Sequence, residues 1–133
     1  MPATEAFHDT NVVLYLLAGD AKAERAEALL AAGGRVSVQV LNEFAAVASR
    51  RLKMPWAEIG AVLDAVRQAC RVESLTPETH LKALALAERY RLRIYDANIV
   101  AAALLAGCKT LHSEDFQPGQ VFERQLRVVN PFE

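Results

Sequence analysis

Four acidic residues of this chain could act together in chemistry if the fold brings their carboxylates to one place. Asp9 and Asp115 each follow a predicted strand, and Asp96 opens a predicted helix. Glu43 lies about 140° around its helix from the centre of the apolar stripe, at roughly 100° per residue. Closely packed carboxylates repel by roughly 1 to 4 kcal/mol per pair, so such a cluster requires cations. Ligands that are all oxygen favour Mg²⁺ or Mn²⁺ over softer metals.

Each acid, taken singly, also has an ordinary structural explanation. Aspartate is a common N-cap, which would account for Asp9 or Asp96. Asp115 would then be a solvated turn residue, and Glu43 a solvated helix residue. A chemical role therefore depends on whether the fold gathers the four side chains.

Predicted strands and helices alternate along the chain and determine where the acids lie. Strands are predicted over residues 5–9, 35–38, 71–75, 109–113 and 126–129. Helices are predicted over residues 11–17, 21–32, 40–53, 55–70, 77–90 and 96–105. This alternation predicts a three-layer α/β/α fold around a central, mostly parallel sheet of about five strands. Ligands bind such sheets beyond the carboxyl ends of the strands, where Asp9 and Asp115 lie.

Apolar patterns indicate which faces of these elements are buried. The helix over 40–53 has one apolar stripe, formed by Leu41, Phe44, Ala45, Ala48 and Leu52. The helix over 96–105 has almost no polar residue after Asn98, which predicts burial nearly all round. Cys70 and Cys108 have no metal-binding spacing, so we expect both to be buried apolar residues.

Composition excludes several classes of protein. The 133 residues are 53% hydrophobic and 23% charged, which is typical of a single folded domain and argues against disorder. The longest apolar run, residues 99–107, is too short to span a membrane, and no signal peptide is visible. We therefore expect a cytoplasmic protein. The net charge is −1, so any polyanion must be met by a local basic patch.

The segments around the four acids form an ordered series of motifs. Residues 8–15 (HDTNVVLY), 40–44 (VLNEF) and 95–103 (YDANIVAAA) each contain one acid. Residues 111–116 (LHSEDF) contain the last, and Asn130-Pro131-Phe132 follows near the end. In this order they resemble the motifs of PIN-domain ribonucleases, in particular the VapC-type toxins of bacterial toxin–antitoxin systems. The resemblance spans essentially the whole chain and implies one nuclease domain over residues 1–133.

The resemblance implies a metal-dependent ribonuclease in which a metal-activated water attacks an RNA phosphodiester. The implied ligands of Mg²⁺ or Mn²⁺, direct or through water, are Asp9, Glu43, Asp96 and Asp115. Asp115 is preferred to its neighbour Glu114 because it lies two residues after Ser113, as the family's Ser/Thr-x-Asp pattern requires. Asn11 and Ser113 are expected to orient carboxylates or waters. A cognate antitoxin and a homodimer are the implied partners.

Cationic residues near the acids are candidates for RNA contact. The candidates are Arg50, Arg51 and Lys53 after the Glu43 helix, and Arg93 before Asp96. The alternative is that they are solvated helix ends. The three histidines are scattered, which makes a direct catalytic role for any of them a poor hypothesis. Trp56 fits either the core or a partner surface.

Other functions fit the acids less well. Phosphatases of the haloacid-dehalogenase type need a second aspartate two residues after the first, where this chain has Asn11. Receiver domains need a phosphorylatable aspartate after a middle strand, where this chain has Thr76-Pro77. Neither of these phosphate-transferring classes explains Glu43. A catalytically inert PIN-like module that binds RNA or protein is the remaining alternative.

Overall fold

A six-stranded sheet forms the centre of residues 6–133, the part of the chain that the computed structural model describes. The strands are β1 (Ala6–His8), β2 (Arg35–Ser37), β3 (Arg71–Glu73), β4 (Thr110–His112), β5 (Val121–Phe122) and β6 (Leu126–Val129). Their order is β3-β2-β1-β4-β6-β5, and only the β5–β6 pair is antiparallel. The predicted mostly parallel sheet is confirmed, with β5 as an additional strand. The first predicted residue of β1, Glu5, lies outside the described residues.

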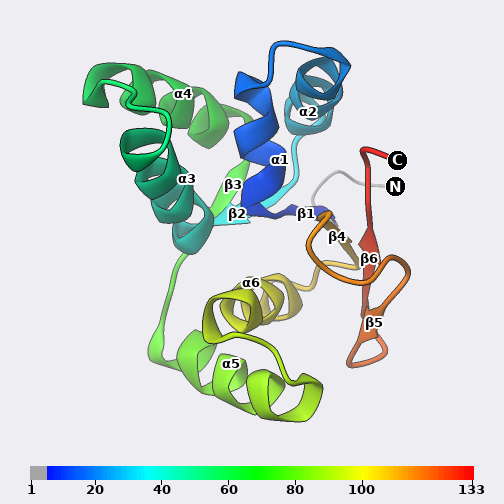
Figure 1. The fold of residues 1–133 in the computed structure, drawn as a ribbon. Coiled ribbons are helices and arrows are strands. Elements are labelled where there is room, and N and C mark those ends of the chain that lie inside the picture. Colours follow the sequence, from blue (N-terminus) through cyan, green and yellow to red (C-terminus); the bar gives the residue numbers. More distant parts are fainter. Residues whose placement is uncertain (1–5) are drawn as a thin grey trace.

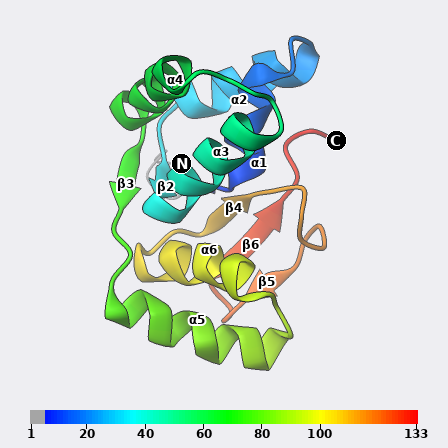
Figure 2. The same ribbon diagram turned by 60° about the vertical axis from the view of Figure 1, so that its left-hand side comes forward.

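Helices cover both faces of this sheet. They are α1 (Thr10–Leu14), α2 (Ala21–Ala31), α3 (Val38–Arg50), α4 (Trp56–Ala69), α5 (Pro77–Tyr90) and α6 (Ile94–Leu105), with a short 3₁₀ turn, η2 (Tyr15–Leu17), after α1. Helices α1 to α4 lie on one side of the sheet, and α5 and α6 lie on the other (Figures 1 and 2). The three-layer α/β/α architecture is therefore confirmed. None of these helices in residues 6–133 has the length and apolar character needed to cross a membrane.

The strand order reverses between β1 and β4, at the middle of the sheet. The chain proceeds outward from β1 to β2 and β3, then returns through α5 and α6 to β4 on the other side of β1. In the parallel register His8 pairs with His112, so the next residues, Asp9 and Ser113, leave adjacent strand ends. Such a reversal leaves a crevice at the carboxyl ends of the strands, which is the usual ligand site in this architecture.

The hydrophobic core fills the space on both sides of the sheet. Phe7, Val36 and Leu111 are fully buried strand residues. The apolar part of α6 from Ile99 to Leu104 is buried throughout, as its sequence predicted. The cysteines are free and buried, as expected. Leu52, predicted to continue the stripe of α3, is 51% exposed because the helix ends at Arg50.

The β5–β6 hairpin has a turn in an unusual backbone conformation. Glu123 and Arg124 have φ angles of 53° and 58°, and the backbone N–H of Gln125 donates to the Phe122 carbonyl (3.0 Å). This is the pattern of a type I′ turn, which favours glycine or asparagine because side chains are strained at positive φ. The Gln125 side chain also donates to the Leu104 carbonyl (3.2 Å) at the end of α6.

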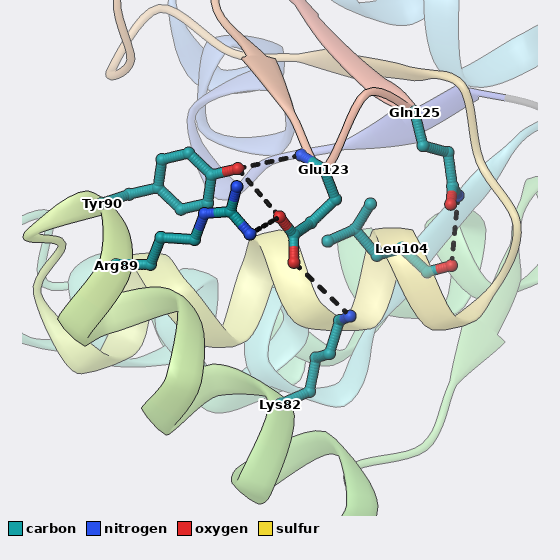
Figure 3. A network of polar contacts seen from close by, with 6 residues as sticks. All are labelled: Lys82, Arg89, Tyr90, Leu104, Glu123 and Gln125. Carbon is teal, nitrogen blue, oxygen red and sulfur yellow. Dashed lines mark hydrogen bonds and ion pairs between the residues drawn. The ribbon is translucent and has the colours of Figure 1, made fainter.

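A polar network attaches this strained turn to α5 (Figure 3). The Glu123 carboxylate accepts a hydrogen bond from the Tyr90 hydroxyl (2.9 Å) and forms ion pairs with Arg89 (3.0 Å) and Lys82 (3.9 Å). The backbone N–H of Glu123 donates to the same Tyr90 oxygen (3.0 Å). Because Arg89 is largely exposed, its ion pair is screened by solvent, and the Tyr90 contact is the main attachment.

Substitutions at the two turn residues are expected to have opposite effects on stability. Glu123→Ala removes the acceptor for Tyr90 and should lower the free energy of unfolding by about 1–2 kcal/mol. Arg124→Gly relieves the strain of a side chain at positive φ without removing a described contact. This substitution should raise the free energy of unfolding by a few tenths to about 1 kcal/mol. Urea denaturation of both variants measures the two changes. A Glu123→Ala variant as stable as the wild type would show that the network does not hold the hairpin.

Candidate active site

Ser113 links the Asp9 carboxylate to the backbone of Asp115 where β1 and β4 end. Its buried hydroxyl donates to Asp9 Oδ2 (2.7 Å) and accepts from the backbone N–H of Asp115 (3.0 Å). Asn11 Nδ2 donates both to Ser113 Oγ (3.2 Å) and to Asp115 Oδ2 (3.1 Å). Because a serine hydroxyl has one hydrogen, the two incoming donors direct that hydrogen to Asp9. Ser113 and Asn11 thus fix the relative positions of the two carboxylates.

Thr10 connects this pair to Glu43 on α3. The Thr10 hydroxyl donates to Glu43 Oε2 (2.8 Å), and its backbone N–H donates to Asp9 Oδ1 (2.7 Å). The second contact makes Asp9 the N-cap of α1, so the capping explanation of this residue is correct and compatible with a place in the cluster. The other Glu43 oxygen accepts from Gln39, one helical turn earlier on α3. Glu43 is partly buried and faces the cluster.

Asp96 lies in the electrostatic field of the other acids. Helix α6 begins at Ile94, two residues before the predicted start, so Asp96 lies in the first turn and does not cap the helix. Burial raises the pKa of Asp96, and the negative charges of Asp115 and Glu43 raise it further, while Arg93 acts in the opposite direction. The structure therefore places Asp96 close enough to Asp115 and Glu43 for their charges to act on it.

Asp9 has the most strongly perturbed carboxyl of this cluster. Its side chain is almost fully buried, and this loss of hydration raises its pKa to about 7. The hydrogen bonds from Ser113 and Thr10 lower the pKa of Asp9, and the charges of Asp115 and Glu43 raise it. A buried carboxyl with a pKa near neutrality is typical of a functional site.

The neighbouring acid Glu114 belongs to a different set of contacts. Its two carboxylate oxygens accept from the Tyr15 hydroxyl (2.9 and 2.8 Å), and the Tyr15 ring packs against Phe132 (4.3 Å between centroids). Asp115, in contrast, contacts Asn11 and Ser113. The geometry thus favours Asp115 over Glu114 as the fourth member of the cluster.

An open cleft of about 910 Å³ lies beside the carboxylates. Its lining includes Asn11, Glu43 and Asp115 from the cluster, Arg51 at the end of α3 and Arg93 before α6. Of the four cationic candidates for RNA contact, these two arginines line the cleft. The other two are exposed and do not line it: Arg50, the last residue of α3, and Lys53, in the loop between α3 and α4.

The donor set of this site fits a hard divalent cation. All the candidate ligands are carboxylate oxygens, and the buried Asn11 Oδ1 has no hydrogen-bond partner in the described residues. No group of three or more His, Cys, Asp or Glu side chains within residues 6–133 is arranged to hold a metal ion directly. Asp9 and Glu43 instead accept hydrogen bonds from Ser113, Thr10 and Gln39. Mg²⁺ keeps several waters and needs only one or two direct carboxylates, so the donor set remains suitable.

Two histidines join β1 and β4 next to the cluster. Their rings stack, with His8 Nδ1 and His112 Nδ1 3.1 Å apart, and His8 Nε2 lies 2.8 Å from the Gly33 carbonyl. Because that carbonyl can only accept, His8 carries its hydrogen on Nε2, and the His112 Nδ1–H donates to His8. Burial lowers the pKa of both, that of His112 to about 4. Both imidazoles are neutral structural links at neutral pH, which agrees with the low expectation of a catalytic role.

Comparisons with known proteins agree with this arrangement. A profile of the PIN domain family matches residues 6–121, which is most of the chain. The chain belongs to the PIN domain family. No curated protein matches the sequence significantly. The predicted family is thereby confirmed, and the motifs that contain the acids Asp9, Glu43, Asp96 and Asp115 all lie within the matched residues.

Solved structures of VapC-type toxins resemble this PIN domain. VapC20 of Mycobacterium tuberculosis, a sarcin-ricin loop cleaving toxin, is 26% identical with a TM-score of 0.67, over 83% of this chain and 89% of that one. A toxin–antitoxin complex from Klebsiella pneumoniae is 21% identical (TM-score 0.73; 96% and 98% covered). VapBC2 from Rickettsia felis, bound to promoter DNA, is 19% identical (TM-score 0.62; 94% and 98%). The last two similarities establish the fold.

The contacts that the sequence did not predict connect residues far apart in the chain. Thr10 and Glu43 are separated by 33 positions, and Tyr15 and Glu114 by 99. A weak signal existed for Gln39, because it lies four residues before Glu43 on the same helix face. No local pattern of this PIN domain indicated the pairing of Tyr15 with Glu114.

Proposed function

We propose that this chain is a metal-dependent endoribonuclease that cleaves RNA phosphodiester bonds as a single PIN domain. The observation that carries the proposal is the cluster at the strand reversal. Asp9 and Asp115 are joined there through Ser113, Glu43 is attached through Thr10, and the charges of Asp115 and Glu43 raise the pKa of both Asp9 and Asp96. Such a concentration of negative charge around the buried carboxyl of Asp9 is unfavourable unless a cation balances it. Membership of the PIN family and the similarity to an RNA-cleaving toxin support RNA as the substrate.

Each site residue has a distinct role in this proposal. The four acids Asp9, Glu43, Asp96 and Asp115 would hold Mg²⁺ or Mn²⁺, directly or through water. When bound, the ion supplies a more nucleophilic water and neutralises charge that develops on the scissile phosphate. Ser113 and Asn11 hold Asp9 and Asp115 in place, and Thr10 holds Glu43 toward them. The arginines of the cleft bind flanking phosphates.

The biological setting follows from the similar structures. A sarcin-ricin loop cleaving toxin and toxin–antitoxin complexes support the proposal that this chain is a toxin with a cognate antitoxin, acting in the cytoplasm. A homodimer is also proposed. Trp56 is 70% exposed rather than packed in the core, and with Leu52 it leaves apolar surface at the start of α4 that a second copy could cover.

Adjacent residues of the chain provide a direct test of the nuclease proposal. Asp115→Asn should reduce RNA cleavage in Mn²⁺ by at least about 100-fold, because it removes a charge from the metal-binding set. Glu114→Gln is the matched comparison, and we expect cleavage to remain within a few-fold of the wild type because Glu114 contacts Tyr15 instead. Initial rates on a radiolabelled single-stranded RNA measure both.

Two results of this comparison would contradict the proposal. Equal activity of Asp115→Asn and the wild type would remove Asp115 from the site. Loss of activity in Glu114→Gln alone would reassign the fourth acid to Glu114. Circular dichroism and denaturation of each variant show whether a lost activity reflects the site or the fold.

The arginines of the cleft give a second test, on RNA binding. Arg51→Gln should reduce the slope of log binding constant against log salt by about 0.7, the contribution of one phosphate contact on single-stranded RNA. Arg50→Gln is the control, since Arg50 precedes it and does not line the cleft. Fluorescence anisotropy over a range of salt concentrations gives both slopes. An unchanged slope for Arg51→Gln would exclude Arg51 as a phosphate contact.

A catalytically inert binding module is the second candidate. It is favoured by the finding that no three acids within residues 6–133 are already arranged around a common metal position. Metal-dependent stability separates the two candidates, because a cation that binds only the folded state stabilises it.

A further inference from the structure

Tyr95 presents a large aromatic ring to the active-site cleft. It lies in the first turn of α6, directly before Asp96, and it is 63% exposed while lining the cleft. In residues 6–133 no hydrogen bond, ion pair or ring contact of its side chain is found. Most large aromatic side chains are at least half buried, so a free ring at this position is available for a ligand.

The α3 side of the same cleft is a single helix face that contains both polar and apolar residues. The residues that line it recur at the spacing of one face, i, i+3, i+4, i+7, i+8 and i+12: Gln39, Asn42, Glu43, Ala46, Val47 and Arg51. On the α6 side, Tyr95 follows Arg93, the other cation of the cleft. The cleft therefore combines an aromatic surface and two guanidinium groups next to the carboxylate cluster.

We propose that Tyr95 is the stacking platform for an unpaired base of the RNA, beside the phosphate that is cut. The inference rests on the proposed ribonuclease function and adds to it a residue, Tyr95, that positions the substrate. Bases in a duplex stack on their neighbours, and their faces are inaccessible to a side chain. Unpaired bases expose both faces, and aromatic rings and arginines are the groups that bind single strands with little sequence preference.

The composition of the cleft favours RNA over a protein as the occupant of this surface. The fully buried centre of a protein interface is depleted of charged residues. The Tyr95 surface, in contrast, adjoins Arg93 on its own side and shares the cleft with Arg51 and Asp115. Two arginines and an exposed aromatic ring that line one cleft suit a polyanion with flat bases. Asn42, exposed on the α3 side, offers an amide to the edge of the stacked base.

A graded series at position 95 tests the stacking role. Tyr95→Phe and Tyr95→Trp retain an aromatic ring, whereas Tyr95→Leu retains apolar bulk without one. Leu81→Ala, on α5 and outside the cleft, is the control for removal of an exposed apolar side chain. Binding is measured in EDTA with a mixed-sequence RNA that contains 2-aminopurine, single-stranded and as a blunt duplex. Cleavage of the single strand is measured in Mn²⁺.

We expect Tyr95→Leu to raise the Kd and KM for the single strand by roughly 5- to 100-fold, with a smaller change in kcat. The phenylalanine and tryptophan variants and Leu81→Ala should bind within a few-fold of the wild type. Quenching of 2-aminopurine should be lost only in Tyr95→Leu. Binding of the duplex should be the same for all variants, because a paired base cannot reach the ring.

The outcomes separate this inference from the proposed function. Normal binding and cleavage by Tyr95→Leu would overturn the stacking role and leave the nuclease intact. RNA binding that depends on Tyr95, without any cleavage in Mn²⁺, would overturn the nuclease and retain the stacking role. If Tyr95→Leu binds RNA normally but weakens self-association in sedimentation, the ring belongs to an interface between copies and the inference is wrong. A Tyr95→Phe variant as impaired as Tyr95→Leu would assign the effect to the hydroxyl and also overturn it.

Discussion

Replacing Asp9 by Asn is expected to abolish RNA cleavage and at the same time to stabilise the metal-free protein above neutral pH. Cleavage should fall by about 10³-fold or more, because the substitution removes the most buried charge of the proposed metal site. Stability should rise because that same charge is desolvated and repelled by Asp115 and Glu43. The two effects have one cause, which is a carboxylate placed where only a cation makes it favourable.

The direction of the stability change follows from proton binding. The pKa of Asp9 is about 7 in the folded state and about 3.8 in the unfolded chain. At a pH between these two values Asp9 is protonated in the folded state and ionised in the unfolded chain. The contribution of Asp9 to stability is therefore present at low pH and is lost as the pH rises through 7. At a pH of about 8 the substitution should recover on the order of 1–3 kcal/mol. The gain is less than the full pKa difference implies, because an amide cannot accept from both Thr10 and Ser113.

Asp20→Asn is the matched control for this experiment. Asp20 is also an N-cap, on α2, and it accepts a hydrogen bond from the backbone of Lys22, but it is exposed and lies outside every motif. Its replacement should leave cleavage unchanged and stability within about 0.5 kcal/mol, since asparagine caps as well as aspartate does. Urea denaturation in EDTA at several pH values measures the stability of both variants. If the Asp9→Asn variant cleaves RNA at the wild-type rate, Asp9 is not part of the active site.

The order of elements and the place of the acids could be predicted because both have local signals. Helical periodicity identified α3, an almost wholly apolar run identified α6, and strand ends placed Asp9 and Asp115 on one edge of the sheet. The start of α6 was predicted two residues late because Asp96 was taken as a possible cap, whereas the N-cap is Arg93, whose side chain makes no capping bond. Strand β5 was missed because two residues, Val121–Phe122, have no periodicity to detect.

The contacts within the site could not be predicted because they depend on the sheet order. The sequence does not specify that β4 pairs with β1, and only this pairing places Ser113 against Asp9. The same pairing decides between Glu114 and Asp115. Glu114 contacts Tyr15, whereas the next residue, Asp115, contacts Asn11. The family resemblance favoured Asp115, and the contacts of Asp115 with Asn11 and Ser113 support that choice.

Mn²⁺ is expected to stabilise the protein strongly at a pH of about 8 and very little at a pH of about 5. A cation that binds only the folded state at 100 times its Kd contributes about 2.7 kcal/mol, which corresponds to a rise in Tm of roughly 10 °C for a chain of this size. Protons compete with the metal for the same carboxylates. With a pKa near 7, only about 1% of Asp9 is ionised at pH 5, so the apparent Kd rises about 100-fold. The same Mn²⁺ concentration then contributes only about 0.4 kcal/mol.

Thermal denaturation with and without Mn²⁺ at the two pH values measures this effect, with Asp9→Asn and Asp20→Asn as paired variants. Asp20→Asn should respond as the wild type does, because its carboxylate lies outside the cluster. Asp9→Asn should respond weakly at both pH values, since the group that titrates is absent. The pKa of Asp96 is also raised, so protons compete with Mn²⁺ at this carboxylate too. The stabilisation by Mn²⁺ should therefore fall between pH 8 and pH 5 at least as steeply as the titration of Asp9 alone would cause. A wild-type protein with no response to Mn²⁺ at pH 8 would identify the chain as an inert PIN module, in which the four acids persist without a metal to hold.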